Sequence, residues 1–340
     1  MNKLSVVIPM VNEFPQVIFT VQNIAQELMG RVDFEIIVVD NYCQAFKTQV
    51  EAQNLKKAQE AAATTDIARI IQLMSDFRSP EPDKGGETMK ACAGRINPWL
   101  KYGTWTKNLS HWQAKRVGVG MATGDVYWFC DSHCIVSRDA VYGMYKYYVD
   151  NYEKINGSIH LPLTYKILEA RKLIYKLVAG DVEKGVVDYS FTPLRIHDQA
   201  FEVPCMSCCG IMLSKEIYDE VGGWPLELGI YGGGEQFMNF TLAVLGKSKW
   251  IYPAGTLHHH GEPRSYHYVY DNYIRNKMIA AYIYGGKDWL TLFASTCKGR
   301  PASLAAIRDE VMAKCREHRD LIKSKQKLTI QEWVQKWISG

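Results

Sequence analysis

Residues 4–11 read Leu-Ser-Val-Val-Ile-Pro-Met-Val, a short β-branched run that ends just before Asn12 and Glu13. Apolar residues at helical spacing follow over residues 17–29, and residues 34–40 form a second apolar run of the same kind. A strand, a helix and a strand in this order make a βαβ unit. Near-continuous Val and Ile runs are typical of parallel strands that are buried on both faces. The sequence therefore predicts an α/β protein with a Rossmann-like, mostly parallel central sheet.

The rest of the chain continues this alternation, with one interruption and a helical end. Residues 79–105 break the rhythm with repeated Pro and Gly, and an irregular segment of that length is usually functional or disordered. From Tyr268 onward the pattern is helical. We therefore expect a domain over residues 1–267 and a helical extension over residues 268–340. Further strands are predicted at residues 67–74, 126–130, 157–162, 201–213 and 248–252, and further helices at residues 51–63, 108–122, 139–150, 166–180, 215–221 and 235–245.

Composition narrows the class of protein. The 340 residues are 47% hydrophobic and 22% charged, which excludes a disordered, collagenous or coiled-coil protein. The formal net charge of +4 is too small by itself to imply a nucleic-acid or membrane partner. Nine cysteines, an odd number, favour reduced thiols in a cytosolic protein. The first apolar run is too short for a signal peptide, and the charges within residues 273–295 exclude a membrane span. We expect a soluble, cytoplasmic protein without a transmembrane segment.

The main chemical signal is the triplet Asp131-Ser132-His133, directly after the predicted strand at residues 126–130. Ligands of open parallel sheets bind outside the carboxyl ends of the strands, so these side chains are expected to face a crevice. A carboxylate and an imidazole two positions apart in an extended segment point the same way and can share a divalent cation. A helix N-cap formed by Asp131 or Ser132 is the structural alternative.

Three further groups of residues lie next to the ends of predicted strands or helices, near the same edge of the sheet. Asp40 closes the second strand, where it can accept from a ribose or a base, or can start a turn. Residues 232–234 are three glycines before Glu235, and they either allow a ligand to approach the backbone or form a flexible loop. In the second case Glu235 complements the helix dipole. Residues 258–260 are three consecutive histidines, which serve as ligands or have a structural role.

In this order, these groups resemble those of the GT-A nucleotide-sugar glycosyltransferases. Residues 5–13, Ser-Val-Val-Ile-Pro-Met-Val-Asn-Glu, look like the first strand of the inverting family 2 enzymes. Residues 114–125, Ala-Lys-Arg-Val-Gly-Val-Gly-Met-Ala-Thr-Gly-Asp, and the triplet at 131–133 look closer to the catalytic domain of the polypeptide N-acetylgalactosaminyltransferases. Those enzymes also carry Asp-x-His and a later Gly-Gly-Glu, here residues 233–235. The similarity covers about residues 3–262 and implies a GT-A fold with metal-dependent transfer from a nucleotide sugar.

The resemblance also implies a role for each matched residue. Asp131, His133 and His258 would hold Mn²⁺ or Mg²⁺, with His260 as the reserve third ligand. The cation would bridge the diphosphate of a nucleotide sugar, most commonly a UDP-linked one. Glu235 would contact the acceptor hydroxyl or the donor sugar, and in an inverting mechanism it would be the general base. Retaining relatives need no such base, so the stereochemistry stays open. The implied donor site comprises Pro9, Val11, Glu13, Asp40, Arg116, Asp131, Gly233 and Gly234, with Pro9, Val11 and Asp40 lining the nucleoside pocket.

Two departures limit what the resemblance transfers. The family 2 enzymes usually carry consecutive acids after the second strand, where this chain has Asp40-Asn41-Tyr42. The polypeptide enzymes have a membrane anchor and a lectin domain, for which this sequence shows no signal. The acceptor of that family is therefore not carried over.

Basic and aromatic residues indicate a nucleic-acid acceptor. Residues 84–116 contain seven basic side chains against one acid, interleaved with four aromatic rings. Cations that follow phosphates beside rings that stack on bases suit a nucleic-acid groove. Residues 298–327 add nine basic against four acidic residues, although an ordinary amphipathic helix explains this tail as well. The leading hypothesis is transfer to a hydroxymethylated pyrimidine in DNA, as some bacteriophage enzymes do, in the host cytoplasm.

Other acceptors and one other class remain open at this point. Aromatic side chains also stack on sugars, so transfer to a surface or lipid-linked polysaccharide is an alternative, and transfer to protein Ser or Thr is a third. A non-catalytic carbohydrate- or nucleic-acid-binding protein would be a different class. The retained set of Asp131, His133, Glu235 and His258 argues against such a binder. Residues 205–209, Cys-Met-Ser-Cys-Cys, lack a second cysteine pair and favour buried thiols over zinc.

Overall fold

The apolar run that opens the chain forms β1 (Lys3–Met10), which lies in the interior of the central sheet. It pairs in parallel with β2 (Asp33–Asp40) and with β4 (Val126–Phe129). Its residues after Lys3 are buried, as the continuous β-branched run predicts. The computed structural model describes residues 1–94, 97–165, 171–179, 182, 185, 187–260, 266, 268–299 and 301–338.

The central sheet is mixed but mostly parallel around β1. The pairs β1–β2, β1–β4 and β2–β3 are parallel, and so is β6–β12, whereas β11 runs antiparallel to both of its neighbours. The predicted α/β class with a mostly parallel sheet is confirmed. Within the part of the chain that the structure describes, the strand order is β10 (Phe201–Glu202), β12 (Ser248–Ile251), β6 (Gly157–His160), β11 (Ile211–Ser214), β4, β1, β2 and β3 (Leu100–Thr104).

A second, smaller sheet brings distant segments together beside the carboxyl end of β4. Its order is β5 (Cys134–Val136), β13 (Leu257–His259), β7 (Leu163–Thr164), β8 (Leu173–Ala179) and β9 (Val187–Pro193). The helix predicted over residues 166–180 is therefore wrong for residues 173–179, and residues 166–170 lie outside the described part. An antiparallel ladder between β8 and β9 overrides the helical spacing, because strand pairing depends on a partner that periodicity does not reveal.

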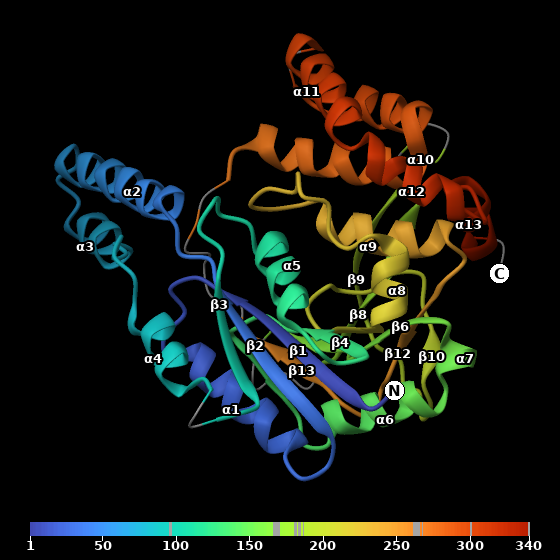
Figure 1. Cartoon of the computed structure of the whole chain (residues 1–340). Coiled ribbons are helices and arrows are strands. Elements are labelled where there is room, and N and C mark those ends of the chain that lie inside the picture. The colour runs from blue at the N-terminus through green and yellow to red at the C-terminus, as the bar shows by residue number, and fades with distance from the viewer. Residues whose placement is uncertain are drawn as a thin grey trace.

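Helices cover both faces of the central sheet. In Figure 1, α5 lies over one face, and α1 and α6 lie over the other. α5 follows a Ser110 N-cap whose hydroxyl accepts from Gln113 N–H, and most of its first half is buried. These helices are α1 (Gln16–Leu28), α5 (His111–Met121), α6 (Ala140–Asp150), α7 (Tyr152–Ile155), α8 (Lys215–Val221) and α9 (Gly234–Val244).

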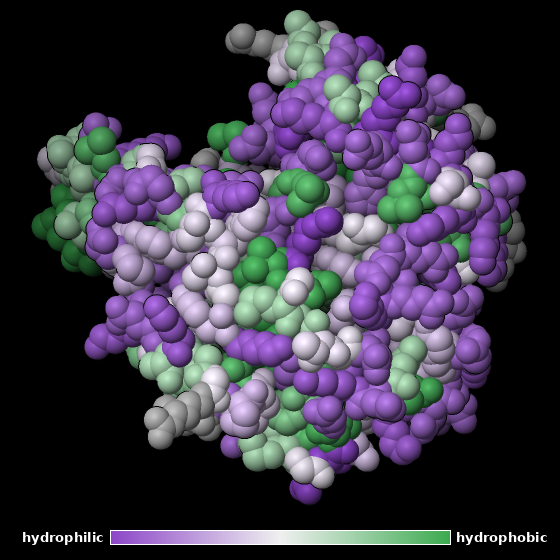
Figure 2. Space-filling model, in the orientation of Figure 1, coloured by the Kyte–Doolittle hydropathy of each residue, from purple (hydrophilic) through white to green (hydrophobic). Residues whose placement is uncertain are grey.

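Two helices form a hairpin that stands out from the body, α2 (Gln44–Ala62) and α3 (Ile67–Ser75) (Figure 1). The strand predicted at residues 67–74 is wrong, because this segment is α3. Its apolar residues recur at the i, i+4, i+7 spacing of a helix face, and Ile67, Ile71 and Met74 are exposed. Figure 2 shows the hydrophobic surface at the outer end of this hairpin.

The segment predicted to be irregular, residues 79–105, carries regular structure. It contains α4 (Lys84–Cys92), which begins at an Asp83 N-cap, and β3, which extends the central sheet beside β2. Residues 95 and 96 lie outside the described part. Gly85 and Gly86 allow α4 to approach β1 and β2, since a Cβ at Gly86 would lie 2.4 Å from Asp40 Oδ2.

The C-terminal part is helical, as predicted, and packs on α9. It comprises α10 (Tyr270–Thr296), α11 (Pro301–Lys314), α12 (Arg316–Lys325) and α13 (Ile330–Ile338). The Phe240 ring of α9 contacts Tyr284 of α10 and Trp333 of α13, with centroids 5.2 and 5.9 Å apart. These side chains belong to the same buried core as the central sheet, and the boundary after residue 267 stays a prediction. Among the described helices, none has the length and hydropathy needed to cross a membrane.

Glu35 on β2 is a buried carboxylate whose ionised form is well partnered. Its Oε2 lies 2.6 Å from Lys101 Nζ, and its Oε1 accepts hydrogen bonds from Ser5 Oγ at 2.7 Å and Thr123 N–H at 2.6 Å. Burial alone would raise the pKa of Glu35, but these partners outweigh burial and lower the pKa from 4.5 to about 2.

Acid is therefore expected to weaken the fold through Glu35. A pKa that is lower in the folded than in the unfolded state stabilises the fold above the unfolded value. That stability is lost as the pH falls toward the folded value. We expect a loss of about 3 kcal/mol between roughly pH 4.5 and pH 2, which Glu35→Gln should remove. Urea unfolding over this pH range measures it, with the exposed Glu153→Gln as control. If the free energy of unfolding of Glu35→Gln falls with pH as steeply as that of wild type, the prediction is wrong.

Candidate active site

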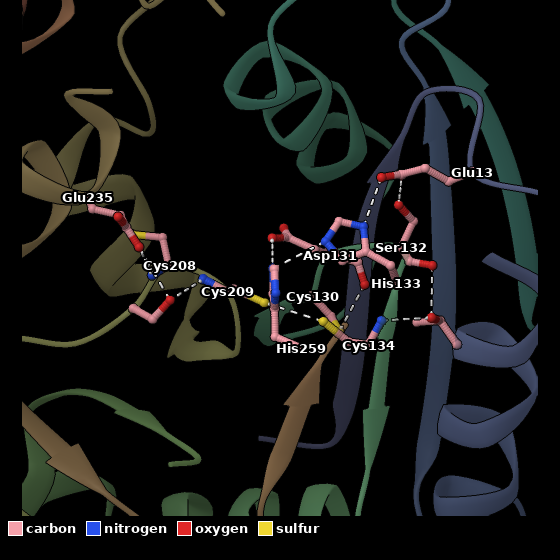
Figure 3. A network of polar contacts seen from close by, with 12 residues as sticks. Glu13, Cys130, Asp131, Ser132, His133, Cys134, Cys208, Cys209, Glu235 and His259 are labelled. Carbon is pink, nitrogen blue, oxygen red and sulfur yellow. Dashed lines mark hydrogen bonds and ion pairs between the residues drawn. The ribbon is translucent and has the colours of Figure 1, made fainter. Parts of the chain in front are cut away.

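Asp131, His133 and His259 lie together at the carboxyl end of β4 (Figure 3). Asp131 follows β4 after one residue, and His133 directly precedes β5. β13 pairs with β5 so that His259 lies opposite Cys134. His259 Nε2 is 3.2 Å from His133 Nε2 and 3.4 Å from Asp131 Oδ2. One carboxylate and two imidazoles that converge in this way are a suitable donor set for a divalent transition-metal ion.

The third member of this group is His259, where the sequence analysis expected His258. Successive side chains of a strand point to opposite faces, so His258 points away from Asp131. The Nδ1 atom of His258 lies 2.7 Å from Thr164 Oγ1. Burial, together with Lys172, lowers the pKa of His258.

Strand parity places His259 on the same face as Leu257 and His258 on the other face, but only the pairing of β13 with β5 decides which face meets Asp131. Leu257 is fully buried, and on a strand the residue two positions later shares its face. His260, the reserve candidate, lines the cavity described below but is not part of the ligand group found among the described residues.

Lys115 places a buried cation beside Asp131. Its Nζ lies 3.3 Å from Asp131 Oδ1, and the side chain is only 2% exposed. The ammonium also lies over the rings of Trp112 and Trp224, 5.2 and 5.8 Å from their centroids. Burial alone would raise the pKa of Asp131, but Lys115 and His259 outweigh it and hold that pKa well below its usual range. The carboxylate is therefore ionised and able to bind a cation.

Glu13 holds the ring of His133 in place. Glu13 Oε1 lies 2.8 Å from His133 Nδ1, and Glu13 Oε2 accepts a hydrogen bond from Ser132 Oγ. Thr20 of α1 donates to the Ser132 carbonyl at 2.9 Å and accepts from Cys134 N–H at 3.1 Å. A carboxylate behind a histidine ligand orients the ring and raises its basicity. Glu13 thus supports His133 from behind, and its predicted contact with the donor stays a prediction.

Glu13→Gln is expected to weaken Mn²⁺ binding by about 10–100-fold, because the amide is a poorer acceptor for the His133 ring. Electron paramagnetic resonance of free Mn²⁺ in a titration measures the affinity. Glu81→Gln is the control, since Glu81 is exposed and pairs with Lys47 on the surface. Equal affinity in wild type and Glu13→Gln would show that this contact does not support the site.

The ligand group opens into a cavity of about 600 Å³. This volume lies in the range of small-molecule binding sites. Residues from both sheets line the cavity. Several residues predicted for the donor, metal or catalytic site line it, namely Pro9, Val11, Glu13, Asp131, His133, Gly233 and Glu235, together with Asn41, Lys115, Tyr165, Tyr175, Tyr189 and His259.

Asp40 does not belong to the lining residues found in the described chain, and its neighbour Asn41 does. The Asp40 carboxylate accepts hydrogen bonds from Tyr42 N–H at 2.9 Å and from Tyr102 Oη at 3.1 Å. The first bond is that of a turn-starting aspartate, the structural alternative in the sequence analysis. Burial raises the pKa of Asp40. Asp40 thus has a structural role in this turn, and its contact with the nucleoside stays a prediction.

Arg116 also lies outside the described lining. Its Nη1 donates to the carbonyls of Gly222 at 3.2 Å and Trp224 at 3.0 Å. This contact fixes the turn after α8 and leaves Lys115 as the cation of α5 that faces the cavity.

The glycines before α9 are required by packing. Gly233 has φ +74°, and a Cβ there would lie 2.1 Å from the Asn276 carbonyl oxygen. A Cβ on Gly234 would lie 2.3 Å from the Trp112 ring. Gly233 lines the cavity, whereas Gly234 packs against Trp112 and is not among the described lining residues.

Glu235 accepts hydrogen bonds on both carboxylate oxygens. Oε1 accepts from Cys208 N–H at 3.2 Å and from Ser207 Oγ and Tyr175 Oη at 3.3 Å. Oε2 accepts from Tyr189 Oη. A carboxylate has about four lone-pair sites, and these four donors use them. A general base needs a lone pair that can accept the proton of the acceptor hydroxyl. Both tyrosines come from the β8–β9 hairpin. The sequence did not predict this hairpin, because the apolar spacing of residues 166–180 is that of a helix.

The basic stretch of residues 84–116 does not form one continuous groove in the described chain. Lys101 is ion-paired with Glu35, Lys115 is buried, and Arg116 binds backbone carbonyls. The four aromatic rings of this stretch do not form one stacking surface either, since Trp112 is buried against Trp224. Lys84, Lys90 and Lys107 remain exposed, and Arg95 lies outside the described residues.

The fold and the cavity together define a class. A mostly parallel sheet carries Asp131 and His133 after β4, and a second small sheet returns His259 to them. This is the GT-A fold of nucleotide-sugar glycosyltransferases, and the resemblance expected from the sequence is confirmed for the fold.

Solved structures and one group of curated proteins show the similarity. A crystal structure of GalNAc-T7 with UDP, GalNAc and Mn²⁺ aligns with a TM-score of 0.67 and 14% identity, covering 100% of this chain and 57% of that chain. A structure of Staphylococcus aureus TarS with UDP aligns with a TM-score of 0.50 and 12% identity, covering 93% of this chain and 72% of that chain. Human polypeptide N-acetylgalactosaminyltransferase 10 is 24% identical over 178 residues, 49% of this chain and 27% of that protein. No family model matches the chain. The matched segment thus spans about a quarter of the curated relative.

Proposed function

We propose that this protein is a metal-dependent glycosyltransferase that moves a sugar from a UDP-linked donor to an acceptor hydroxyl. The observation that carries the proposal is the group of Asp131, His133 and His259, which opens into the cavity beside a buried lysine. The GalNAc-T7 structure of the same fold was solved with UDP, GalNAc and Mn²⁺, which supports this reading of the cavity.

Each residue of the group has a defined task in this proposal. Asp131 supplies a negatively charged ligand, which Lys115 keeps ionised. His133 supplies a ring nitrogen, and Glu13 orients the His133 ring. His259 brings the third donor from the second sheet. Asp131, His133 and His259 would hold a divalent cation, Mn²⁺ or Mg²⁺, which would supply positive charge to a diphosphate leaving group.

The nucleoside is proposed to bind where β1 and β2 end. Pro9, Val11 and Asn41 line the cavity there, and Val11 packs in a small apolar cluster with Leu109. Asn41 is held rigidly, because its side chain donates to the carbonyls of Trp105 and Asn108 at 2.8 Å. A fixed apolar wall with backbone polar groups suits the flat face of a uracil ring.

We propose that Glu235 positions the sugar end of the site. Glu235→Gln is expected to lower transfer by roughly 10²-fold, because the new NH₂ group faces hydroxyl and N–H donors and leaves them unpaired. Mn²⁺ affinity should stay at the wild-type level, since Glu235 does not belong to the ligand group. Transfer kinetics and an Mn²⁺ titration on the same sample measure both. Full transfer in the variant would contradict the assignment.

The acceptor is proposed to be a hydroxymethylated pyrimidine in DNA. The exposed Lys84, Lys90 and Lys107 and the net basic tail support an anionic partner. Aromatic rings in the cavity, among them Tyr165 and Tyr175, equally suit a glycan, so a surface or lipid-linked polysaccharide is the second acceptor class.

A panel of nucleotide sugars with Mn²⁺ tests the function. We expect hydrolysis of one UDP-sugar without acceptor, and loss of that hydrolysis after chelation. The active donor is then offered with hydroxymethylated DNA, unmodified DNA and simple glycans. Product only on modified DNA supports the first acceptor, and product on glycans replaces it with the second. No metal-dependent turnover of any donor would leave a binding protein with the same fold.

A further inference from the structure

Two cysteine thiols lie directly beside the Asp131–His133–His259 group. Cys134 Sγ and Cys209 Sγ are 3.5 Å apart, although the two residues come from β5 and from the segment before β11. Cys134 lies opposite His259 in the β5–β13 pair. One ligand atom from each of Cys134, Cys209 and His259 falls within 4.8 Å of the others. Figure 3 shows the two sulfur atoms facing each other next to the His259 ring.

His259 thus stands between two sets of donors. Its Nε2 faces Asp131 and His133, whereas its Nδ1 is buried without a hydrogen-bond partner in the described chain. A buried polar atom without a partner costs about 1–3 kcal/mol and calls for an explanation. A ligand bound beside the thiols would give this side of the ring a partner.

The spacing of the sulfur atoms suits a soft divalent ion. With Zn–S bonds of about 2.3 Å, two thiolates on a tetrahedral ion lie roughly 3.8 Å apart, close to the observed separation. Cys209 lines the cavity and Cys134 is buried behind it, so an ion can enter from the cavity. Thiolate and imidazole ligands favour Zn²⁺ or Cd²⁺ over Mn²⁺ and Mg²⁺.

We propose that Cys134, Cys209 and His259 form a second metal site, selective for Zn²⁺ and Cd²⁺, that shares His259 with the Asp131–His133–His259 group. Binding replaces two S–H bonds by two metal–sulfur bonds and releases two protons to solvent, with no change of oxidation state. A neutral imidazole that binds Zn²⁺ through Nδ1 carries its proton on Nε2, so His259 cannot also bind Mn²⁺ through Nε2, and Zn²⁺ therefore displaces Mn²⁺. Inhibition of transfer by Zn²⁺ follows only if the proposed function holds, whereas the site itself does not depend on that function.

The binding test uses Cd²⁺ with the whole 340-residue chain, freed of metal and kept reduced with a phosphine. Cd²⁺ is expected to produce thiolate-to-metal charge-transfer absorption in the ultraviolet that saturates at one equivalent. Cys134→Ser and Cys209→Ser should each reduce that absorption by about half and weaken Cd²⁺ binding by more than roughly 100-fold, since even losses behind a ligand cost 10–100-fold. Cys315→Ser, which replaces a buried thiol on the far helical part, should keep the wild-type band.

The sharing of His259 is tested by competition. Zn²⁺ should release bound Mn²⁺ from wild type, read by the resonance of free Mn²⁺, and should do so far less effectively in Cys134→Ser. The proposal is overturned if folded wild type gives no thiolate band, or if Cys134→Ser gives the wild-type band. Equal Zn²⁺ competition in Cys134→Ser would also overturn it, because Zn²⁺ would then act at Asp131 and His133. Circular dichroism of each variant verifies folding.

Discussion

Asp131→Asn is expected to abolish Mn²⁺-dependent hydrolysis of the UDP-sugar, with a loss of at least about 10³-fold. The variant removes the negative ligand from the group with His133 and His259, and such charge stabilisation contributes several kcal/mol to the barrier. Asparagine keeps the shape of aspartate, and its Oδ1 can still accept from Lys115 Nζ, which lies 3.3 Å from the native carboxylate oxygen. Because the variant also leaves the buried Lys115 without its counter-charge, hydrolysis is compared only after circular dichroism has shown that the variant is folded. Donor hydrolysis and Mn²⁺ titration measure the loss.

The matched control is Asp150→Asn at the end of α6, where the carboxylate is exposed and pairs with Lys146. This control should retain wild-type hydrolysis and Mn²⁺ affinity. If Asp131→Asn keeps full metal-dependent hydrolysis, the metal assignment is wrong, and with it the proposed chemistry.

Lys115→Met is expected to destabilise the fold by about 3 kcal/mol. Breaking a buried ion pair by removing one partner costs roughly 3–5 kcal/mol, because the remaining charge is left uncompensated. We expect the lower end of that range, since the Asp131 side chain is 26% exposed toward the cavity and keeps some hydration. Methionine keeps most of the apolar stem of Lys115, whose ammonium end lies near the rings of Trp112 and Trp224. Urea unfolding at neutral pH measures the change in the free energy of unfolding.

The double variant Lys115→Met/Asp131→Asn separates charge from packing. If the uncompensated carboxylate causes the loss, neutralising Asp131 in the Lys115→Met background should restore a large part of it. Losses that simply add would show that the lysine stem, and not the ion pair, stabilises this region. Adding Mn²⁺ to Lys115→Met should also raise its stability, because a bound cation replaces the missing charge.

The elements that were predicted correctly are those whose signal is local. The runs at residues 4–11 and 34–40 became β1 and β2, and residues 126–130 contain β4, because long buried strands need continuous apolar residues. The helix expected over 108–122 contains α5, which starts after the Ser110 cap. α3 was mistaken for a strand although its apolar residues follow a helical spacing.

Within the site, the sequence pointed to the residues whose position depends on one strand end. Asp131 and His133 follow β4 directly, and the carboxyl end of a parallel strand opens into the crevice wherever the strand lies in the sheet. Lys115 and Arg116 could not be told apart, because which of two adjacent helix residues faces the sheet depends on the rotation of α5. Glu235 was found, but its tyrosine partners on β8 and β9 were not.

Local apolar patterns were enough to predict the α/β class, the strand that Asp131 and His133 follow, and the helical C-terminal part. Only the pairing of distant segments places His259 in the group, brings Tyr102 to the Asp40 carboxylate, and brings two thiols together beside the histidine. His133 and His259 are 126 positions apart, and they meet only through the register between β13 and β5. A shift of that register by one residue would present His258 instead, because neighbouring side chains of a strand face opposite ways.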